Sequence, residues 1–157
     1  DNTKLGEKMT CNTLPVPVAV GDEHISLNFS SGSYTYSLSN RHRGTKSNTK
    51  STWTVNTTIE VELFEESMKK SYINNQLSWN IHSTYIGYDK DGSNVKLARF
   101  DSRNATNNEW HGYPVDYSKD PNNRPSKDIL IEWVKSSIIT NSEKIKILRG
   151  RTVKALL

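Results

Sequence analysis

The sequence predicts an α+β fold, in which an antiparallel sheet of five or six strands is followed by one or two C-terminal helices packed on it. Apolar and polar residues alternate in several segments between residues 24 and 100, which is typical of strands with one solvated face. Apolar residues between 129 and 138 recur instead at the 3.6-residue spacing of an amphipathic helix. The 16 Asn, 19 Ser and 14 Thr residues fill the opposite faces and the loops, which favours a folded sheet with a wet side.

Length and composition limit the classes of protein to which this chain can belong. We expect a single domain over residues 1–157, with residues 1–14 as a loosely ordered lead-in. Aromatic residues make up 9% of the chain and include four Trp, which favours a folded chain although only 33% of residues are hydrophobic. The single cysteine excludes an intrachain disulfide, and no apolar run is long enough to span a membrane.

The first strands are predicted from prolines and period-two alternation. Residues 14–18 contain two alternating prolines, which indicates an extended edge segment. Residues 24–29 and 34–38 each place apolar side chains on one face, and the Ser-Gly turn between them predicts a β-hairpin. The polar, basic residues 39–51 are expected to form a long exposed loop.

The next segment is predicted to hold the longest strand. Residues 52–63 keep one apolar face in phase from Trp53 onward, so Glu60 and Glu62 are expected on the solvated side. A short helix is predicted over residues 64–73, where apolar residues fall loosely at helical spacing.

A second hairpin is predicted in the middle of the chain. Residues 79–88 and 94–100 flank residues 89–93, whose Asp-Gly step is a strong turn signal. The same run resembles the start of a calcium loop, but it lacks the later acidic ligands of that loop. Residues 101–125 are polar and proline-punctuated, and we expect a loop there.

The C-terminal third is predicted to be helical. Ser126 is a good N-cap for a helix over residues 127–137. Residues 140–143 match a capping box, which favours a second helix over residues 141–149. A strand remains the alternative for this segment, because Lys, Ile, Lys and Ile alternate from residue 144 to residue 147.

One group of residues has the composition of a catalytic site. An imidazole titrates near neutral pH, so His111 is the candidate general acid or base, and Asp101 or Asp116 is the candidate residue that orients it. Arg99 would bind a phosphate or an oxyanion, and Tyr113 completes the group. This set would suit metal-independent phosphodiester cleavage or transfer. The structural alternative is that the aromatic residues plug the end of the sheet and His111 is a hydrogen-bonded bystander.

The region around this group has one family resemblance. Residues 85–114 run in the order strand, Asp-Gly turn, strand, Arg99-Phe100-Asp101 and a loop that contains His111. This order resembles small bacterial toxin–antitoxin proteins of the TumE type, in which a strand ends in an Arg-x-Asp-like motif before a His-bearing loop. The family's loop carries paired histidines, where this chain has His111 alone. The resemblance implies a role in a bacterial conflict system.

Basic residues are concentrated in two places. Residues 79–157 carry the whole net charge of +4, and the runs 41–50 and 144–154 contain no acidic residue. Such runs are either a solvated face or a surface that contacts phosphates. The two predicted C-terminal helices would also resemble a helix-turn-helix. The candidate residues for binding nucleic acid or a partner are Arg41, Arg43, Lys46, Lys144, Lys146, Arg149 and Arg151.

Three functional hypotheses follow. The first is a small cytoplasmic binding protein of a bacterial or phage conflict system, whose basic C-terminal face engages nucleic acid or an acidic protein. The second is an RNase-like or transferase-like enzyme centred on His111. The third is a secreted or surface interaction module, which the start of the chain at Asp1 rather than Met would suit. No cofactor and no metal are expected, because the four histidines and one cysteine show no metal-ligand spacing.

Overall fold

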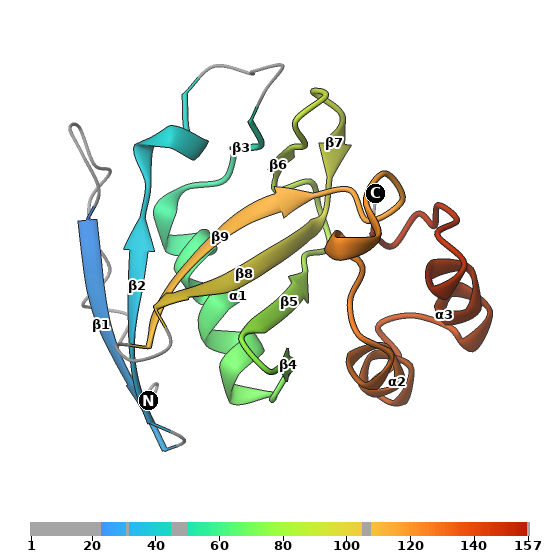
Figure 1. Cartoon of the computed structure of the whole chain (residues 1–157). Helices are drawn as coiled ribbons and strands as arrows, with labels where there is room; N and C mark the ends of the chain where they lie inside the picture. Colours follow the sequence, from blue (N-terminus) through green and yellow to red (C-terminus); the bar gives the residue numbers. More distant parts are fainter. Residues whose placement is uncertain (1–22, 31, 45–49, 105–107, 157) are drawn as a thin grey trace.

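The computed structural model describes residues 23–30, 32–44, 50–104 and 108–156 (Figure 1). Within these residues the strands are β1 (Glu23–Phe29), β2 (Gly32–Leu38), β3 (Thr52–Trp53), β4 (Ile73–Asn74), β5 (Leu77–Ile81), β6 (Gly87–Tyr88), β7 (Asn94–Val95), β8 (Leu97–Asn104) and β9 (Glu109–Val115). The helices are α1 (Thr57–Lys69), α2 (Lys127–Lys135) and α3 (Asn141–Leu148), with short 3₁₀ turns η2 (Asn40–His42) and η3 (Pro121–Asn123). In Figure 1, α1 lies behind the strands, whereas α2 and α3 lie together at one side.

The described strands form a mixed sheet in the order β1-β2-β9-β8-β5-β4 and a smaller sheet in the order β3-β6-β7. The α+β class is confirmed. The prediction of a purely antiparallel sheet is wrong, because β2 and β9 run parallel, with Thr35 opposite Glu109. The prediction that the helices follow the sheet is wrong for α1, which lies between β3 and β4 in the chain. The two corrections are connected. Two parallel neighbouring strands need a long connection, and α1 lies within the connection between β2 and β9.

The first predicted hairpin is confirmed. β1 and β2 pair antiparallel, and their connection lies between Phe29 and Gly32. Ile25, Leu27 and Tyr36 are buried, so the alternation in the sequence identified the core face of both strands. The predicted lead-in (residues 1–14) and edge segment (residues 14–18) lie outside the described residues.

The prediction of a long strand over residues 52–63 is wrong. The strand ends at Trp53, and the side chain of Asn56 starts α1 by accepting a hydrogen bond of 3.0 Å from the Ile59 amide. The alternating apolar residues of this segment instead belong to a helix with an extensive buried side. The predicted helix over residues 64–73 begins too late and ends too late, because α1 starts at Thr57 and ends at Lys69 and Ile73 begins β4. Most of the buried residues of α1 recur at helical spacing, and the full set is Thr57, Glu60, Val61, Leu63, Phe64, Glu65, Ser67 and Met68.

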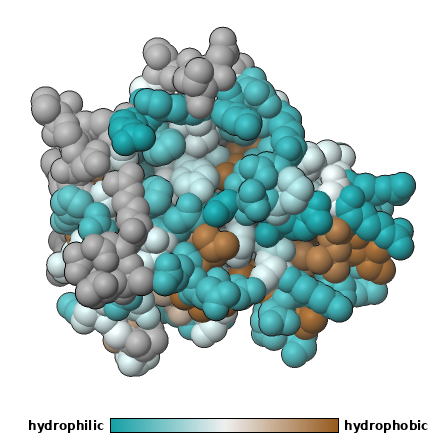
Figure 2. Space-filling view, in the orientation of Figure 1, coloured by the Kyte–Doolittle hydropathy of each residue, from teal (hydrophilic) through white to brown (hydrophobic). Residues whose placement is uncertain are grey.

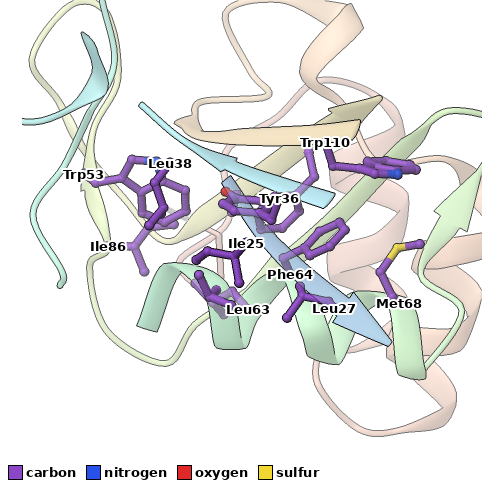
Figure 3. Packing of buried hydrophobic residues seen from close by; sticks show 13 residues of the cluster. Ile25, Leu27, Tyr36, Leu38, Trp53, Leu63, Phe64, Met68, Ile86 and Trp110 are labelled. Carbon is purple, nitrogen blue, oxygen red and sulfur yellow. The ribbon is translucent and has the colours of Figure 1, made fainter. Parts of the chain in front are cut away.

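The buried side of α1 packs into a hydrophobic core beneath β1, β2, β8 and β9 (Figure 3). The ring of Phe64 lies 4.9 Å from the ring of Tyr36, 5.4 Å from that of Phe100 and 5.7 Å from that of Trp110, measured between centroids. Glu60 also faces this core and is only 2% exposed, so its predicted place on a solvated face is wrong. This core fixes the side of β8 and β9 that faces α1.

The second predicted hairpin is present, but its pairing is split between the two sheets. β5 pairs with β8, and β6 pairs with β7 close to the turn. The carboxylate of Asp89 accepts hydrogen bonds from the amides of Asp91 (3.0 Å) and Ser93 (2.8 Å), and Gly92 has a φ of 85°. The Asp-Gly step therefore makes the turn that the sequence predicted.

The prediction of a loop over residues 101–125 is wrong at residues 101–104, which are the end of β8, and at residues 109–115, which form β9. Gly112 lies so close to Phe100 that a Cβ atom there would be 2.3 Å from its ring, so the glycine serves close packing rather than a turn. Pro114 lies beyond Trp110, where the described pairing of β9 with β2 ends, so its missing N–H costs no hydrogen bond to β2.

The two predicted C-terminal helices are confirmed. Ser126 caps α2, and both hydrogen bonds of the capping box between Thr140 and Glu143 are present at α3, so the strand alternative for residues 144–149 is wrong. Trp133 of α2 and Ile147 of α3 are fully buried in a second core that includes strand residues such as Leu97 and Val115. No helix in the described part of the chain is long and apolar enough to cross a membrane.

The two cores lie on opposite sides of the sheet. Successive residues of a strand point to opposite faces, so Ala98 and Phe100 face α1 while Leu97 and Arg99 face the other way. The C-terminal helices use the part of this second face near Leu97. From Arg99 onward this second face is polar, and candidate catalytic residues lie there.

Candidate functional site

Four of the five candidate catalytic residues share this polar part of the sheet. In the register of β8 and β9, Arg99 is opposite Tyr113 and Asp101 is opposite His111. Residues two apart on a strand point to the same side, so all four side chains lie on the face away from α1. The β8–β9 pairing therefore gathers Arg99, Asp101, His111 and Tyr113.

Asp101 is the centre of this group. Its carboxylate accepts hydrogen bonds from Arg99 Nε (2.9 Å) and from the Tyr113 hydroxyl (2.7 Å). Arg99 Nη1 also donates to the Asn122 carbonyl oxygen (2.7 Å) and to Asn123 Oδ1 (3.0 Å), which ties the strand to η3. Burial, followed by the bond to Asp101, raises the pKa of Tyr113 far above its ordinary value, so the phenol stays protonated and acts as a donor.

His111 lies beside this network. Its ring centroid is 5.8 Å from that of Tyr113, and the two ring planes are tilted by 37°. Because both oxygens of Asp101 already accept hydrogen bonds from Arg99 and Tyr113, Asp101 is held by these two residues. The role of His111 as an acid or base stays a prediction.

Asp116 lies apart from the other four candidates and binds its own neighbours. One carboxylate oxygen accepts hydrogen bonds from the Ser118 amide (2.8 Å) and hydroxyl (2.6 Å), and the other lies 3.9 Å from Lys119 Nζ. Asp116 thus shapes the turn after β9, next to the sheet group rather than within it.

A pocket of about 480 Å³ is lined by three of the candidate catalytic residues, Arg99, Tyr113 and Asp116, whereas Asp101 and His111 are not part of its lining. It lies where β8 and β9 meet residues from three other parts of the chain: His42, Lys50 and Ser51 before β3, the hairpin turn after β6, and the segment that leads into η3. The lining residues are His42, Lys50, Ser51, Leu77, Asp89, Lys90, Arg99, Tyr113, Pro114, Val115, Asp116, Lys119, Asp120, Asn122 and Asn123. This volume lies in the range of small-molecule sites.

His42 is the histidine that lines the pocket. Its ring stacks on the Tyr113 ring, with centroids 5.7 Å apart and an interplanar angle of 22°. Its Nδ1 lies 3.0 Å from the Ser51 carbonyl oxygen, and because a carbonyl only accepts, this contact is a hydrogen bond when the ring proton is on Nδ1. Nε2 is then the basic nitrogen of the neutral ring.

Lys119 and Asp89 form a charge pair in the pocket wall. Lys119 Nζ lies 2.7 Å from Asp89, 3.3 Å from Asp91 and 3.9 Å from Asp116. Burial favours a higher pKa for Asp89, but the hydrogen bonds from Lys119 and from backbone amides outweigh it and hold the pKa below its usual value. The hydrogen bond to Asp89 is also the main reason that the pKa of Lys119 is raised. The positive charge of Lys119 is therefore neutralised by this wall.

The basic residues predicted near residues 41–50 are not equivalent. Arg43 donates from Nη1 to the Val55 carbonyl oxygen (2.6 Å) and from Nη2 to buried Glu60 (2.5 Å), so it stabilises the core. Burial raises the pKa of Glu60 despite this ion pair and the hydrogen bond from Tyr36. Arg41 is exposed in η2, and Lys46 lies outside the described residues.

The basic residues predicted at the C-terminus lie on α3 and in the segment that follows it. We call this surface the α3 face and define it by Lys144, Lys146, Arg149 and Arg151. Within the part of the chain that the structure describes, none of the four takes part in an ion pair. Ile145, between the first two, is 40% exposed. Figure 2 shows hydrophobic side chains at the surface over α3 and α2, bordered by hydrophilic ones.

The sequence did not identify several pocket residues as site candidates. His42 and Lys50 lie within the basic run 41–50, but no pattern in the sequence showed that this run reaches β9. Lys90 and Asp89 were interpreted only as parts of a turn. The polar content of that turn, beyond what a hairpin needs, is the signal that could have pointed to them.

Comparisons with protein-family models, curated proteins and solved structures find no match. Among the described residues, no group of three or more His, Cys, Asp or Glu side chains is placed to hold a metal ion. The α3 face and the pocket are therefore interpreted from their own chemistry.

Proposed function

We propose that the protein binds nucleic acid and that the α3 face is the binding surface. The observation that carries this proposal is the difference between two sets of cations. Arg43, Arg99 and Lys119 are held by carboxylates within the fold, whereas the four cations of the α3 face have no such partner among the described residues. Cations without an internal partner are available to phosphates.

The physical chemistry of the α3 face suits a phosphate backbone. Phosphates bound by Lys and Arg release condensed counterions, which drives association without any requirement for sequence. Lys146 lies on α3 and Arg149 is its C-cap residue, three positions later, and both are exposed, whereas Ile147 between them is buried. The exposed Ile145 can contact sugars or bases. A role in a conflict system and a cytoplasmic location stay predictions from the sequence.

A titration followed by fluorescence anisotropy tests this function. The probes are fluorescein-labelled 20-nucleotide single-stranded DNA, RNA of the same sequence, the matching DNA duplex and labelled poly-L-glutamate, all at low salt. We expect at least one nucleic acid to bind and poly-L-glutamate to bind more weakly, since the exposed Ile145 can contact sugars or bases, which poly-L-glutamate lacks. Binding of poly-L-glutamate alone would refute the proposal and favour an acidic protein partner. Absence of binding by every nucleic acid would also refute it.

The enzyme hypothesis is the second candidate, because Arg99, Tyr113 and a histidine, His42, line one pocket. Incubation with 5′-labelled RNA in the presence of a chelator tests it. The hypothesis predicts cleavage that is lost in the His111→Ala variant. Cleavage that is unchanged in this variant but lost in His42→Ala would move the acid–base role to His42, and no cleavage by the wild-type protein would refute the hypothesis.

A further inference from the structure

The pocket has features that the fold does not require. Its wall contains the neutralised group of Lys119 and Asp89, but two further lysines at the pocket, Lys50 and Lys90, make no ion pair with any residue that the structure describes. The acidic residue Asp120 caps η3 by accepting a hydrogen bond of 2.9 Å from the Asn122 amide. Positive charge without a partner is thus concentrated at the side of the pocket that holds the two lysines.

The positions of these lysines follow from strand pairing. β3 and β6 pair antiparallel, with Thr52 opposite Tyr88. Lys50 lies two residues before β3 and Lys90 two residues after β6, so both lysines are at the same end of this strand pair, and both line the pocket. Two like charges that line one pocket repel each other. An anion bound between them would remove this repulsion, so the pair is suited to hold one.

Arg99 adds a rigid donor to the same pocket. Its Nε and Nη1 atoms are engaged with Asp101, Asn122 and Asn123, which fixes the plane of the guanidinium group. Nη2 makes no hydrogen bond with any described residue, so its two N–H groups remain for a ligand. A guanidinium that is already held in place loses little conformational entropy when it binds.

The pocket also has a flat aromatic element. The stacked rings of His42 and Tyr113 lie beside the apolar side chains of Leu77, Pro114 and Val115, all of which line the pocket. Such a surface suits a planar ring. The carboxylate of Asp120 lies in the same lining, where it can accept hydrogen bonds from ring N–H groups.

From these features we propose that the pocket binds a nucleoside phosphate, with its phosphate at Lys50 and Lys90 and its base beside His42 and Tyr113. Arg99 Nη2 donates hydrogen bonds to the sugar or to the phosphate of this ligand. The ligand is either a free nucleotide or the phosphorylated end of an oligonucleotide, because both present the same chemistry. This site is independent of the α3 face, which engages a polymer backbone.

Isothermal titration calorimetry of the full chain tests this site. The probes are AMP, GMP, CMP and UMP, with the matching nucleosides as controls that lack phosphate. We expect one or more monophosphates to bind more tightly than about 1 mM, and the matching nucleoside to bind at least about tenfold more weakly. The Lys50→Ala/Lys90→Ala variant should lose at least about tenfold in affinity. The Lys70→Ala variant removes an exposed lysine on the opposite, α1 side, and it should bind like the wild type.

Two further experiments distinguish a free nucleotide from a nucleic-acid end as the ligand, and separate this site from the α3 face. Competition of a bound monophosphate by a 5′-phosphorylated dodecanucleotide, but not by its 5′-hydroxyl form, would identify a nucleic-acid end as the source. Competition by neither would identify a free nucleotide. The Lys146→Ala/Arg149→Ala variant should keep its affinity for monophosphates even if it loses affinity for polymers. Equal affinity for nucleoside and nucleotide, no effect of the Lys50 and Lys90 substitutions, or no binding of any monophosphate at millimolar concentration would each overturn the proposal.

Discussion

The α3 face makes a quantitative prediction about salt. We consider the double substitution Lys146→Ala/Arg149→Ala, because these two residues are exposed and neither belongs to the buried core that contains Ile147. Alanine is a good helix former, so the variant should keep α3 folded. The substitution therefore removes charge from the proposed interface without a change in the core.

The size of the effect follows from counting cations. If the four cations of the α3 face each contact one phosphate, the slope of log K against log salt concentration is about −3.6 for duplex DNA and about −2.8 for a single strand. The double variant should show slopes of about −1.8 and about −1.4. Between about 50 and about 200 mM salt, the affinity of the wild type for duplex should fall about 150-fold, and that of the variant only about 12-fold.

Anisotropy titrations at four salt concentrations measure both slopes. The matched control is Lys70→Ala on α1, which also removes one exposed positive charge but lies away from the α3 face and pairs with Glu66 at 3.1 Å. It should leave the slope within error of the wild type. Equal slopes for the double variant and the wild type would refute the assignment of phosphate contacts to the α3 face. An equal loss in the Lys70→Ala variant would show that only net charge matters.

Three further predictions concern stability and are measured by urea unfolding. Gly112→Ala should lower the free energy of unfolding by about 3 kcal/mol, because its Cβ would lie 2.3 Å from the Phe100 ring; an unchanged midpoint would contradict this packing. Asn56→Ala should cost about 1 kcal/mol by removing the N-cap of α1, and no loss would mean that the cap is not needed. Asp89→Asn should cost about 1–2 kcal/mol at pH 7 by removing the charged partner of Lys119. Since the pKa of Asp89 is lower in the folded state, this stabilisation is present above the ordinary carboxyl pKa and is lost as pH falls through the folded value. The difference between wild type and Asp89→Asn should therefore vanish in acid, and a difference that is independent of pH would contradict the charge pair.

Local signals in the sequence predicted the elements that are stabilised locally. The caps at Ser126 and Thr140 predicted α2 and α3, and the Asp-Gly step predicted the turn at Asp89. The alternation over residues 24–29 and 34–38 predicted a hairpin whose strands are neighbours in sequence. Each of these elements forms its defining contacts within a few residues.

The errors occurred where local pattern and tertiary packing disagree. Ile59, Val61 and Leu63 alternate as in a strand, but the cap at Asn56 and the Glu-rich sequence that follows favour a helix. The polar residues and prolines of 101–125 suggested a loop, yet Gly112 and Pro114 lie in β9, where Gly112 packs directly against the Phe100 ring. No local signal could show that β2 pairs in parallel with β9.

The candidate site also combines residues that are close in the sequence with residues that only the tertiary fold brings near. The pairing of β8 with β9 places Arg99, Asp101, His111 and Tyr113 on one face of the sheet, whereas the sequence placed His111 and Tyr113 in a loop and grouped them by composition alone. His42 and Lys50 reach the pocket only through the fold of a segment about 60 residues before β9 in the chain. A pocket built from distant segments has no signature in a single sequence.

The most direct test of the proposed nucleic-acid interface is a map of the bound surface by NMR. Amide signals of ¹⁵N-labelled protein are followed during titration with an unphosphorylated single-stranded dodecanucleotide at low salt. The largest shifts are expected in α3 and at Arg149 and Arg151, with α1 unaffected. Shifts confined to other elements, or no shifts at saturating oligonucleotide, would contradict the proposal that the α3 face binds nucleic acid.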